Sequence, residues 1–232
     1  WGGGLIKFDG VHFSQFRDFD FFGNNIITAI AEDSSGIIWF STFRGGVLKY
    51  QNGYFEKYSA DAGSRASTMI FESEGLILST FEGIVDFRYG KTRKINAPID
   101  SLKRRIHCMI KMNGNFIIGT DNGAYLGDTS LTKWDTIFSS INSLFDVKRV
   151  NDQLWLHTDS GLFVSNVNQL NQSPQCVYSK KLKGFEIDNT GNIWIGTGSG
   201  LKMLSLTEKD TSITDFGSKN GQRGVEFSKK AF

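Results

Sequence analysis

The chain has 232 residues, which is long enough for one large domain or two modest ones. Its 26 Lys and Arg residues against 24 Asp and Glu residues give a formal charge of +2, which argues against a nucleic-acid partner. With 26 Gly, 20 Phe and only 2 Pro, the composition favours short aromatic strands joined by many turns, so we expect an all-β fold. No long apolar run occurs, and we expect no membrane contact by this segment itself.

One motif recurs five times along the chain, and its spacing predicts the architecture. The shared core is Thr-x-x-Gly, and its threonines are Thr42, Thr80, Thr120, Thr158 and Thr197. They follow one another at intervals of 38, 40, 38 and 39 residues. The opening segment WGGGLIKFDGVHFSQF aligns with FRGGVLKYQNGYFEKY at an offset of 42, so the chain begins within a sixth repeat. A period of this size is typical of solenoids and propellers.

Each repeat contains four short strands, as the first complete one illustrates. Residues 26–33 alternate apolar and small or polar side chains, and after a turn residues 37–42 form a second β-rich run. A further turn leads into residues 47–51, and Asn52-Gly53 is a strong hairpin signal before residues 54–59. No window has the apolar spacing of a helix, which argues against a helical solenoid.

We therefore predict an all-β fold, a β-propeller of four-stranded antiparallel blades with about six blades represented. We expect the propeller to be incomplete and cut from a longer chain. Residues 1–232 form a single domain in this interpretation. Its repeats are placed at about 1–25, 26–64, 65–104, 105–142, 143–182 and 183–232.

Two columns of residues precede each threonine at fixed distances. Three positions before it stand the large residues Trp39, Ile77, Ile117, Trp155 and Trp194. One position before it stand Ser41, Ser79, Gly119, His157 and Gly196. Because side chains alternate along a strand, both columns face the same way. We interpret the tryptophans as core residues packed between blades rather than as platforms for sugar stacking.

The turns at residues 32–36 and 188–191 resemble the acidic loops with which some propellers bind calcium. We interpret them as ordinary turns, because Asp and Asn side chains cap their own turn amides and Gly supplies a positive φ. The acidic pattern is lost in the middle repeats, at residues 112–115 and 150–153. We expect no metal site and no cofactor.

Catalytic and redox motifs have little support. The three histidines are His12, His107 and His157, and none is paired with a carboxylate at motif spacing, so we expect no catalytic residue. We interpret His157 as structural. Cys108 and Cys176 lack the spacing of a zinc site, and the sequence leaves open whether they form a disulfide or remain two thiols.

The segments IAEDSSGIIWFSTFRGGVLKY, from residue 30, and FEIDNTGNIWIGTGSGLKML, from residue 185, carry a recognisable pattern. In them the chain resembles the two-component regulator propeller repeat. The match weakens in the middle repeats, where Ile77 and Ile117 replace Trp, although the Thr-x-x-Gly frame is kept. The final segment ITDFGSKNGQRGVEFSKKAF is similar to a stretch that precedes the last blade in this family.

This resemblance implies a function. Such propellers form the periplasmic sensor of hybrid histidine kinases of glycan-degrading Bacteroidetes and are thought to sense carbohydrate breakdown products. We therefore expect a periplasmic or extracellular ligand-sensing ectodomain that binds a glycan or small molecule and is no enzyme itself, since a kinase would lie in a missing C-terminal region. Expected partners are the remainder of the parent chain and, in that parent, a second copy as a homodimer. The alternatives are a propeller enzyme similar to streptogramin lyase and a scaffold for surface or secretion assembly.

The predicted binding site lies on the Thr-x-x-Gly loops. In a four-stranded blade, the loop between the second and third strands and the link to the next blade emerge at the same end. Aromatic and hydrogen-bonding groups alternate on these loops, which suits an oligosaccharide or a protein edge. The alternative is a set of ordinary solvated turns. The candidate residues are Trp1, Phe43, Arg44, Phe81, Glu82, Asp121, Asn122 and Asp159.

Overall fold

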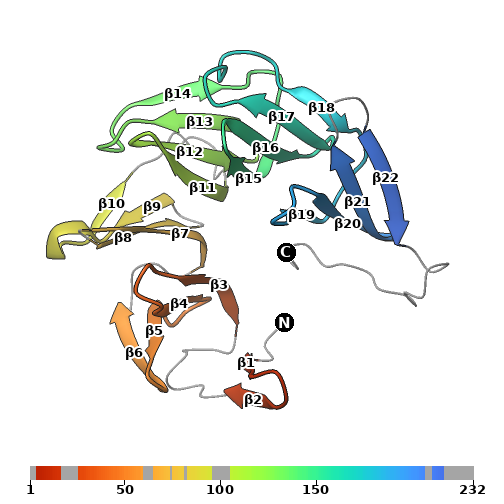
Figure 1. Cartoon of the computed structure of the whole chain (residues 1–232). Coiled ribbons are helices and arrows are strands. Elements are labelled where there is room, and N and C mark those ends of the chain that lie inside the picture. Colours follow the sequence, from red (N-terminus) through yellow and green to blue (C-terminus); the bar gives the residue numbers. More distant parts are fainter. Residues whose placement is uncertain are drawn as a thin grey trace. The chain divides into compact units, whose positions relative to one another are not determined.

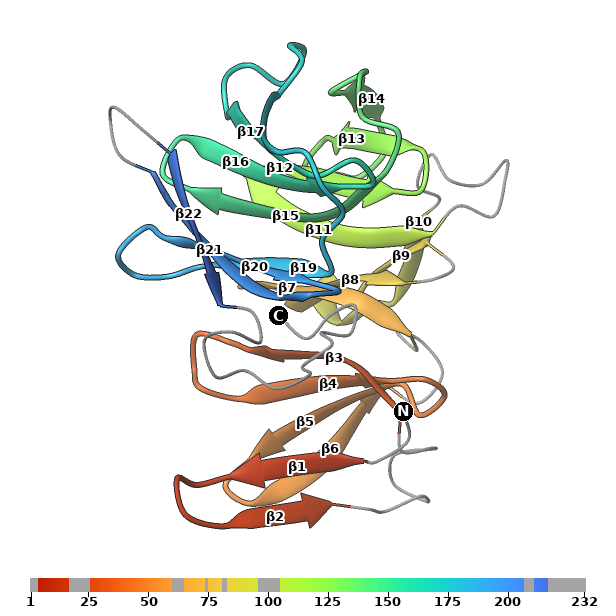
Figure 2. The same ribbon diagram turned by 90° about the vertical axis from the view of Figure 1, so that its right-hand side faces the viewer.

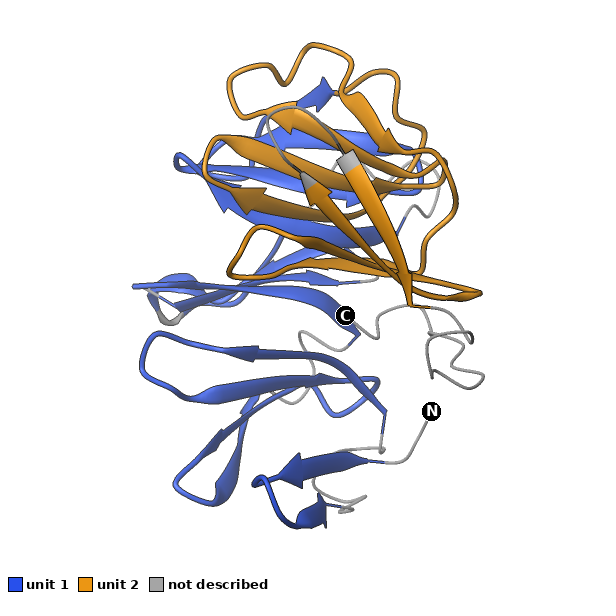
Figure 3. Ribbon diagram, turned by 45° about the vertical axis from the view of Figure 1, so that its right-hand side comes forward, with its two compact units in different colours: residues 1–137 blue, residues 138–232 orange. Residues whose placement is uncertain are grey.

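The computed structural model describes residues 4–16, 26–59, 65–73, 75–80, 83–95, 105–206 and 211–216. The chain divides into two compact units, residues 1–137 and 138–232 (Figure 3). Within the described residues, the regular structure consists of β-strands and one short 3-10 helix, η1 (Arg88–Gly90). No helix in these residues is long and apolar enough to cross a membrane.

Unit 1 contains three four-stranded sheets and one two-stranded sheet, all antiparallel and formed from strands that follow one another in the chain (Figure 1). The two-stranded sheet is made of β1 (Leu5–Phe8) and β2 (Phe13–Phe16). The first four-stranded sheet comprises β3 (Ile27–Glu32), β4 (Ile38–Thr42), β5 (Val47–Gln51) and β6 (Tyr54–Ser59). The next comprises β7 (Ala66–Glu72), β8 (Gly75–Thr80), β9 (Gly83–Asp86) and β10 (Arg93–Ile95). The last comprises β11 (Ile106–Met112), β12 (Asn115–Thr120), β13 (Gly123–Gly127) and β14 (Trp134–Ile137).

Unit 2 contains two further four-stranded antiparallel sheets. The first comprises β15 (Leu144–Val150), β16 (Gln153–Thr158), β17 (Leu162–Asn166) and β18 (Gln175–Tyr178). The second comprises β19 (Gly184–Ile187), β20 (Ile193–Thr197), β21 (Gly200–Leu206) and β22 (Thr211–Phe216). In every four-stranded sheet the strand order equals the chain order, which is the topology of a propeller blade. The predicted four-stranded antiparallel blades are therefore confirmed.

The hydrophobic core lies between neighbouring sheets. One cluster joins β7–β10 to β11–β14, with Ile77 and Phe116 fully buried. A second joins β3–β6 to β7–β10 around Val47 and Leu78. In unit 2 a cluster that includes Trp155 joins β15–β18 to β19–β22. Each blade is therefore stabilised mainly by the apolar faces that it shares with its neighbours, as in other repeat proteins.

Two tryptophans of the repeat are tied to the acidic turn that precedes them. The indole Nε1 of Trp39 donates to Asp33 Oδ2 at 2.8 Å, and Trp194 donates to Asp188 at the same distance. The other carboxylate oxygen of Asp33 accepts the turn amides of Ser35 and Ile37. The hydrogen bond from Trp39 lowers the pKa of Asp33. The interpretation that these aspartates cap their own turns is confirmed.

The three tryptophans differ in burial. Trp39 and Trp155 are 9% and 3% exposed, as expected for core residues. Trp194 is only half-buried, and its ring lies 5.4 Å from that of Phe216 in the outermost strand of its sheet. The sequence column thus marks two core residues and one residue that is held at the sheet surface by its bond to Asp188.

The small residues before the threonines connect blades in unit 1. Ser41 is fully buried, and its Oγ accepts the backbone N–H of Ala66, which belongs to the next sheet. Ser79 shares a 2.8 Å hydrogen bond with Ser67, whose hydroxyl lies 3.0 Å from the carbonyl of Ile106 in the following sheet. These positions therefore allow close approach and also supply polar contacts between blades.

The β1–β2 hairpin is built like the outer half of a complete blade. Its pairs Ile6–Gln15, Lys7–Ser14 and Phe8–Phe13 have the same register as three pairs between β5 and β6. Those pairs, 42 residues later, are Leu48–Lys57, Lys49–Glu56 and Tyr50–Phe55. One face of the hairpin, with Leu5 and Phe16, packs against the sheet β3–β6, and Figure 2 shows the hairpin beside that sheet.

The other face of this hairpin is exposed. Ile6, Phe8 and Phe13 are 57%, 54% and 73% exposed, and the two phenyl rings stack at 4.5 Å. The equivalent position to Ile6 in the next repeat is Leu48, which is fully buried against Leu5 and Phe16 of the hairpin. In the repeat of Leu48 this face is therefore covered by the hairpin, whereas the corresponding face of the hairpin itself is exposed.

A buried ion cluster lies where β9 leads into η1. Asp86 is 5% exposed, and Arg88 donates to both of its carboxylate oxygens at 2.9 Å. Arg93 donates to Asp86 Oδ2 at 2.9 Å and also to the carbonyl of Ser130, in the turn between β13 and β14. Burial alone would raise the pKa of Asp86, but the hydrogen bonds from Arg88 and Arg93 outweigh it and lower the pKa from 3.8 to about 2.

This cluster predicts a loss of stability in acid. Because the pKa of Asp86 is lower in the folded state than in the unfolded one, its contribution is present above about pH 4 and lost as the pH falls towards 2. We expect Asp86→Asn to lower the free energy of unfolding at neutral pH by about 2 kcal/mol and to flatten its slope between these pH values. Urea titrations of both proteins across this range measure it. Asp135→Asn, on the exposed side of β14, is the control, and an equal effect there would contradict the assignment.

Candidate functional site

The Thr-x-x-Gly loops join the second strand of each blade to the third, and their threonines are structural. Each hydroxyl donates back to the carbonyl at the start of the third strand or just before it, and the side chains are buried. The Oγ–O distances are 3.4 Å for Thr42–Gly46, 2.9 Å for Thr80–Gly83, 3.0 Å for Thr120–Gly123, 3.1 Å for Thr158–Gly161 and 2.8 Å for Thr197–Gly200. The bonds fix the loops, so the residues between Thr and Gly have a defined position.

Five of the predicted site residues lie in the described part of the chain. Phe43, Arg44, Asp121 and Asn122 belong to unit 1 and Asp159 to unit 2. The other three, Trp1, Phe81 and Glu82, lie outside the described residues.

Phe43 meets the link that leads to the next blade. Its ring centre lies 3.9 Å from the guanidinium carbon of Arg65 and 5.8 Å from that of Arg44. Backbone bonds hold the three segments together, since Phe43 donates to the carbonyl of Ile26 and Arg65 donates to that of Thr42. The predicted meeting of loop and link at one end of the blade is present here. The result is an aromatic ring with two cations beside it, a combination that can contact both an apolar surface and hydrogen-bond acceptors.

Asp121 is paired with a histidine that sequence reasoning did not place in the site. His107 is buried, and its Nε2 lies 2.5 Å from Oδ1 of Asp121, whose side chain is 52% exposed. Burial alone would raise the pKa of Asp121, but the hydrogen bond from His107 keeps it below its ordinary value. The neighbouring Asn122 is exposed, and its backbone N–H donates to Thr120 Oγ1. The loop therefore presents an oriented, charged acceptor to solvent.

The histidine occupies a β-bulge that recurs in the blades. In the first strand of four sheets the pairing shifts by one residue, which leaves one residue outside the regular ladder. These bulge residues are Thr28, Ser67, His107 and Phe145. Each contacts the second strand or its loop, through Ser41, Ser79, Asp121 and His157, respectively. A column 13 or 14 residues before four of the five threonines is the signal that could have identified them.

The other polar and titratable residues singled out in the sequence make fewer contacts that would define a binding site. In unit 2, Asp159 is half-buried, and the loop around it is closed by bonds between Thr158 and Ser160. His157 is 3% exposed and packs edge-on against Phe145, which fits a structural role. Cys108 is a buried thiol in β11, and Cys176 is an exposed thiol in β18. In the part of the chain that the structure describes, no group of three or more His, Cys, Asp or Glu residues could hold a metal ion.

Comparison with protein families identifies one repeat. Residues 21–44 match the family described as "Two component regulator propeller". The resemblance predicted from the sequence is thereby confirmed in the repeat that contains Thr42. No curated protein is significantly similar to the chain.

Several solved structures share the fold. The extracellular domain of BT4673 from B. thetaiotaomicron, described as a hybrid two component system, is 19% identical with a TM-score of 0.77, over 97% of this chain and 32% of that one. PorZ, described as a surface component of the type-IX secretion system of Porphyromonas gingivalis, is 16% identical with a TM-score of 0.67, over 88% and 36%. The WD40 propeller domain of Doa1 is 11% identical with a TM-score of 0.66, over 92% and 76%. The chain thus has a β-propeller fold and spans about a third of the length of the first two structures.

Proposed function

We propose that the chain is part of the sensing ectodomain of a two-component signalling protein, located in the periplasm or outside the cell. The family match at residues 21–44 and the likeness to the extracellular domain of BT4673 support this proposal. In this proposal the chain binds its ligand without converting it chemically and passes the signal to the remainder of its parent protein. The parent protein forms a homodimer.

The ligand in this proposal is a carbohydrate held by the Thr-x-x-Gly loops of unit 1. The observation that carries it is the pairing of the exposed Asp121 carboxylate with the buried His107, which fixes an acceptor for sugar hydroxyls. The ring of Phe43 with its flanking Arg65 and Arg44 adds an apolar face and donors on the same kind of loop. Trp1, Phe81, Glu82 and Asn122 complete the proposed set in unit 1, and Asp159 is the candidate on the equivalent loop of unit 2.

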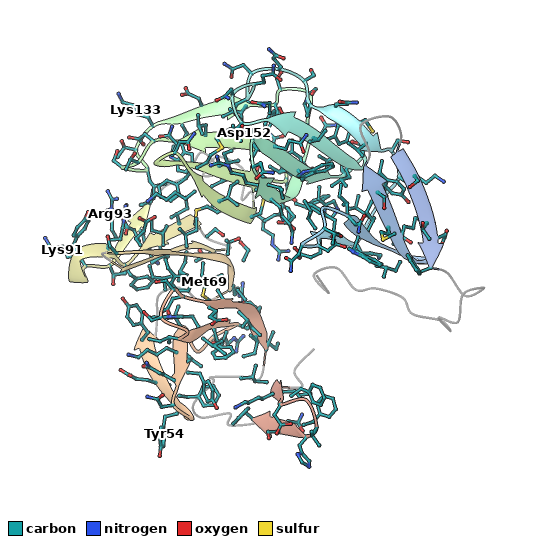
Figure 4. The ribbon with its side chains drawn as sticks, viewed as in Figure 1. Tyr54, Met69, Lys91, Arg93, Lys133 and Asp152 are labelled. Atoms are coloured by element: carbon teal, nitrogen blue, oxygen red, sulfur yellow. The ribbon has the colours of Figure 1, made fainter. Side chains whose placement is uncertain are left out.

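The test compares two charge-matched double variants in the parent ectodomain. We expect Arg44→Ala with Asp121→Ala to weaken binding of a glycan by about tenfold or more, because two hydrogen-bonding side chains are removed. A panel of neutral oligosaccharides titrated by calorimetry first identifies the glycan that binds the parent. The control is Arg149→Ala with Asp152→Ala (Figure 4 labels Asp152). It removes one cation and one carboxylate near the turn between β15 and β16, at the end of that blade away from its Thr-x-x-Gly loop. Equal affinity of the first variant and the parent would exclude the loops as the site.

A scaffold for surface or secretion assembly is the second candidate, because PorZ shares the fold. It requires no small ligand. The same panel separates the two functions: a scaffold binds none of the glycans, and the parent protein then co-purifies with outer-surface proteins rather than responding to sugars. The lyase alternative predicts turnover of the bound ligand, which the calorimetric titration would reveal as continuing heat.

A further inference from the structure

A concentration of positive charge lies at the other end of the blades of unit 1. Residues 86–95 hold four cations and one carboxylate, a net charge of +3, whereas the whole chain carries +2. We define the basic edge as Arg88, Lys91, Arg93 and Lys94, together with Lys133 of the neighbouring blade. Figure 4 shows Lys91, Arg93 and Lys133 at the outer side of unit 1.

The two arginines of the basic edge are fixed by hydrogen bonds. The one carboxylate of residues 86–95, Asp86, is buried and engaged by Arg88 and Arg93, so it does not present a negative charge at the surface. Arg93 remains 50% exposed while its Nη2 also donates to the carbonyl of Ser130, 3.2 Å away. This bond crosses from one blade to the next. The guanidinium is therefore held in place before any ligand arrives, which reduces the entropy lost on binding.

The turn that receives Arg93 is equally well ordered. Asp128 accepts the backbone amides of Thr132 and Lys133 at 2.7 and 2.9 Å and contacts the hydroxyl of Ser130. These bonds leave the side chain of Lys133 exposed at the end of the turn. Cations from two adjacent blades thus lie at one end of these blades.

An exposed aromatic ring stands beside these cations. Tyr89 is 71% exposed and has φ of 60°, a left-handed conformation that is unfavourable for a bulky side chain. It lies in η1, directly after Arg88, which Asp86 fixes. The backbone therefore holds a tyrosine outward at the tip of the basic edge, where its ring can stack on the apolar face of a sugar.

We propose that the basic edge binds an anionic polysaccharide, a polymer that carries sulfate or uronate groups. Arginine and lysine pair with such groups, the ring of Tyr89 packs on a sugar ring, and cations on two blades require a ligand with several anions along its length. A polymer of this kind meets all three features.

This surface is separate from the proposed glycan site. η1 and the turn at residues 128–133 connect third to fourth strands, whereas the Thr-x-x-Gly loops connect second to third strands. Because consecutive strands are antiparallel, the two sets of connections lie at opposite ends of the blades. The basic edge can therefore retain the protein on a charged matrix while the other end remains accessible.

The experiment measures binding of dextran sulfate and of polygalacturonate to this chain, with uncharged dextran as the control ligand. At about 50 mM salt we expect both charged polymers to bind and dextran not to bind. Lys91→Ala with Lys133→Ala should weaken binding about tenfold and reduce the slope of log affinity against log salt by about 2. Tyr89→Ala, which leaves the charge unchanged, should weaken it about fivefold. The matched control, Lys180→Ala with Lys181→Ala, removes two exposed cations of unit 2 and should have little effect.

Three outcomes would overturn the proposal. The first is that neither charged polymer binds the folded chain. The second is that the Lys180/Lys181 variant loses as much affinity as the Lys91/Lys133 variant, which would indicate a diffuse charge effect. The third is that a short DNA duplex binds as tightly as the polymers and Tyr89→Ala changes nothing, which would indicate a general polyanion surface. Circular dichroism of each variant confirms that it is folded, and none of the substitutions replaces Asp86, Arg88 or Arg93.

Discussion

Gly161→Ala is expected to destabilise unit 2 by about 3 kcal/mol or more. Gly161 ends the fourth Thr-x-x-Gly motif with φ of 150°, and a Cβ placed on it would lie 2.0 Å from the carbonyl oxygen of Tyr178. That oxygen belongs to the backbone of β18, so it cannot move aside without breaking the pairing of β17 with β18. Gly161 also exchanges hydrogen bonds with Thr158, and any shift would loosen the loop.

The measurement is chemical unfolding of the variant beside Gly198→Ala. Gly198 lies within the next Thr-x-x-Gly motif, where an added Cβ would meet nothing within 4 Å. We expect this control to change the unfolding midpoint very little. Similar unfolding midpoints for the two variants would show that the carbonyl of Tyr178 does not prevent a larger side chain at position 161.

The second large effect is expected from Trp155→Ala, with a loss of about 3–5 kcal/mol. Trp155 is 3% exposed and packs with Leu162, Tyr178 and Phe185 in the core that joins the two sheets of unit 2. Removing the indole leaves a large cavity that rigid strands on both sides cannot fill.

Trp194→Ala serves as the comparison, because the two residues share one column of the repeat. Its half-buried ring contacts Phe216, and its Nε1 donates to Asp188, so we expect a loss of about 1–2 kcal/mol. Acrylamide quenching of the Trp194→Phe and Trp155→Phe proteins gives an independent measure of which indole is exposed. If Trp194→Ala destabilised the protein more than Trp155→Ala, the assignment of the core would be wrong.

The blade architecture could be predicted from the sequence because its main determinants are local. The Thr-x-x-Gly loop closes by hydrogen bonds within a few residues, and the Asp33–Trp39 contact spans only six positions. Locality also fits two of the middle repeats. Where Ile77 and Ile117 replace tryptophan, no indole N–H requires a carboxylate, and before Ile117 the acidic turn is replaced by the one at Asn113, with φ of 51°. The repeat of Trp155 lacks the acidic turn as well, at residues 150–153, so a tryptophan by itself does not require that turn.

The candidate site was predicted only in part, because its contacts join residues from different strands and blades. Asp121 was a candidate, but its partner His107 depends on a β-bulge that hydrophobic alternation does not reveal. The contact of Arg65 with Phe43 joins a link to a loop 22 positions earlier, and Arg93 reaches Ser130 across two blades. The partial exposure of Trp194 could not be predicted for the same reason, since its ring contacts Phe216 in another strand, β22.

Because β1–β2 and β5–β6 have matching registers, we expect that a copy of the first two strands of a repeat can be joined to the third and fourth strands of another. In sequence, Thr42 runs into Phe43-Arg44-Gly45-Gly46 as a preceding threonine would run into Trp1-Gly2-Gly3-Gly4. A duplicate of residues 26–42 joined directly before Trp1 would therefore supply two inner strands in phase with the hairpin and complete a four-stranded sheet, and the face with Ile6, Phe8 and Phe13 would be covered once a further sheet packs on it. The Thr-x-x-Gly loops are thus natural joints for permuting this protein or lengthening it by one blade at a time.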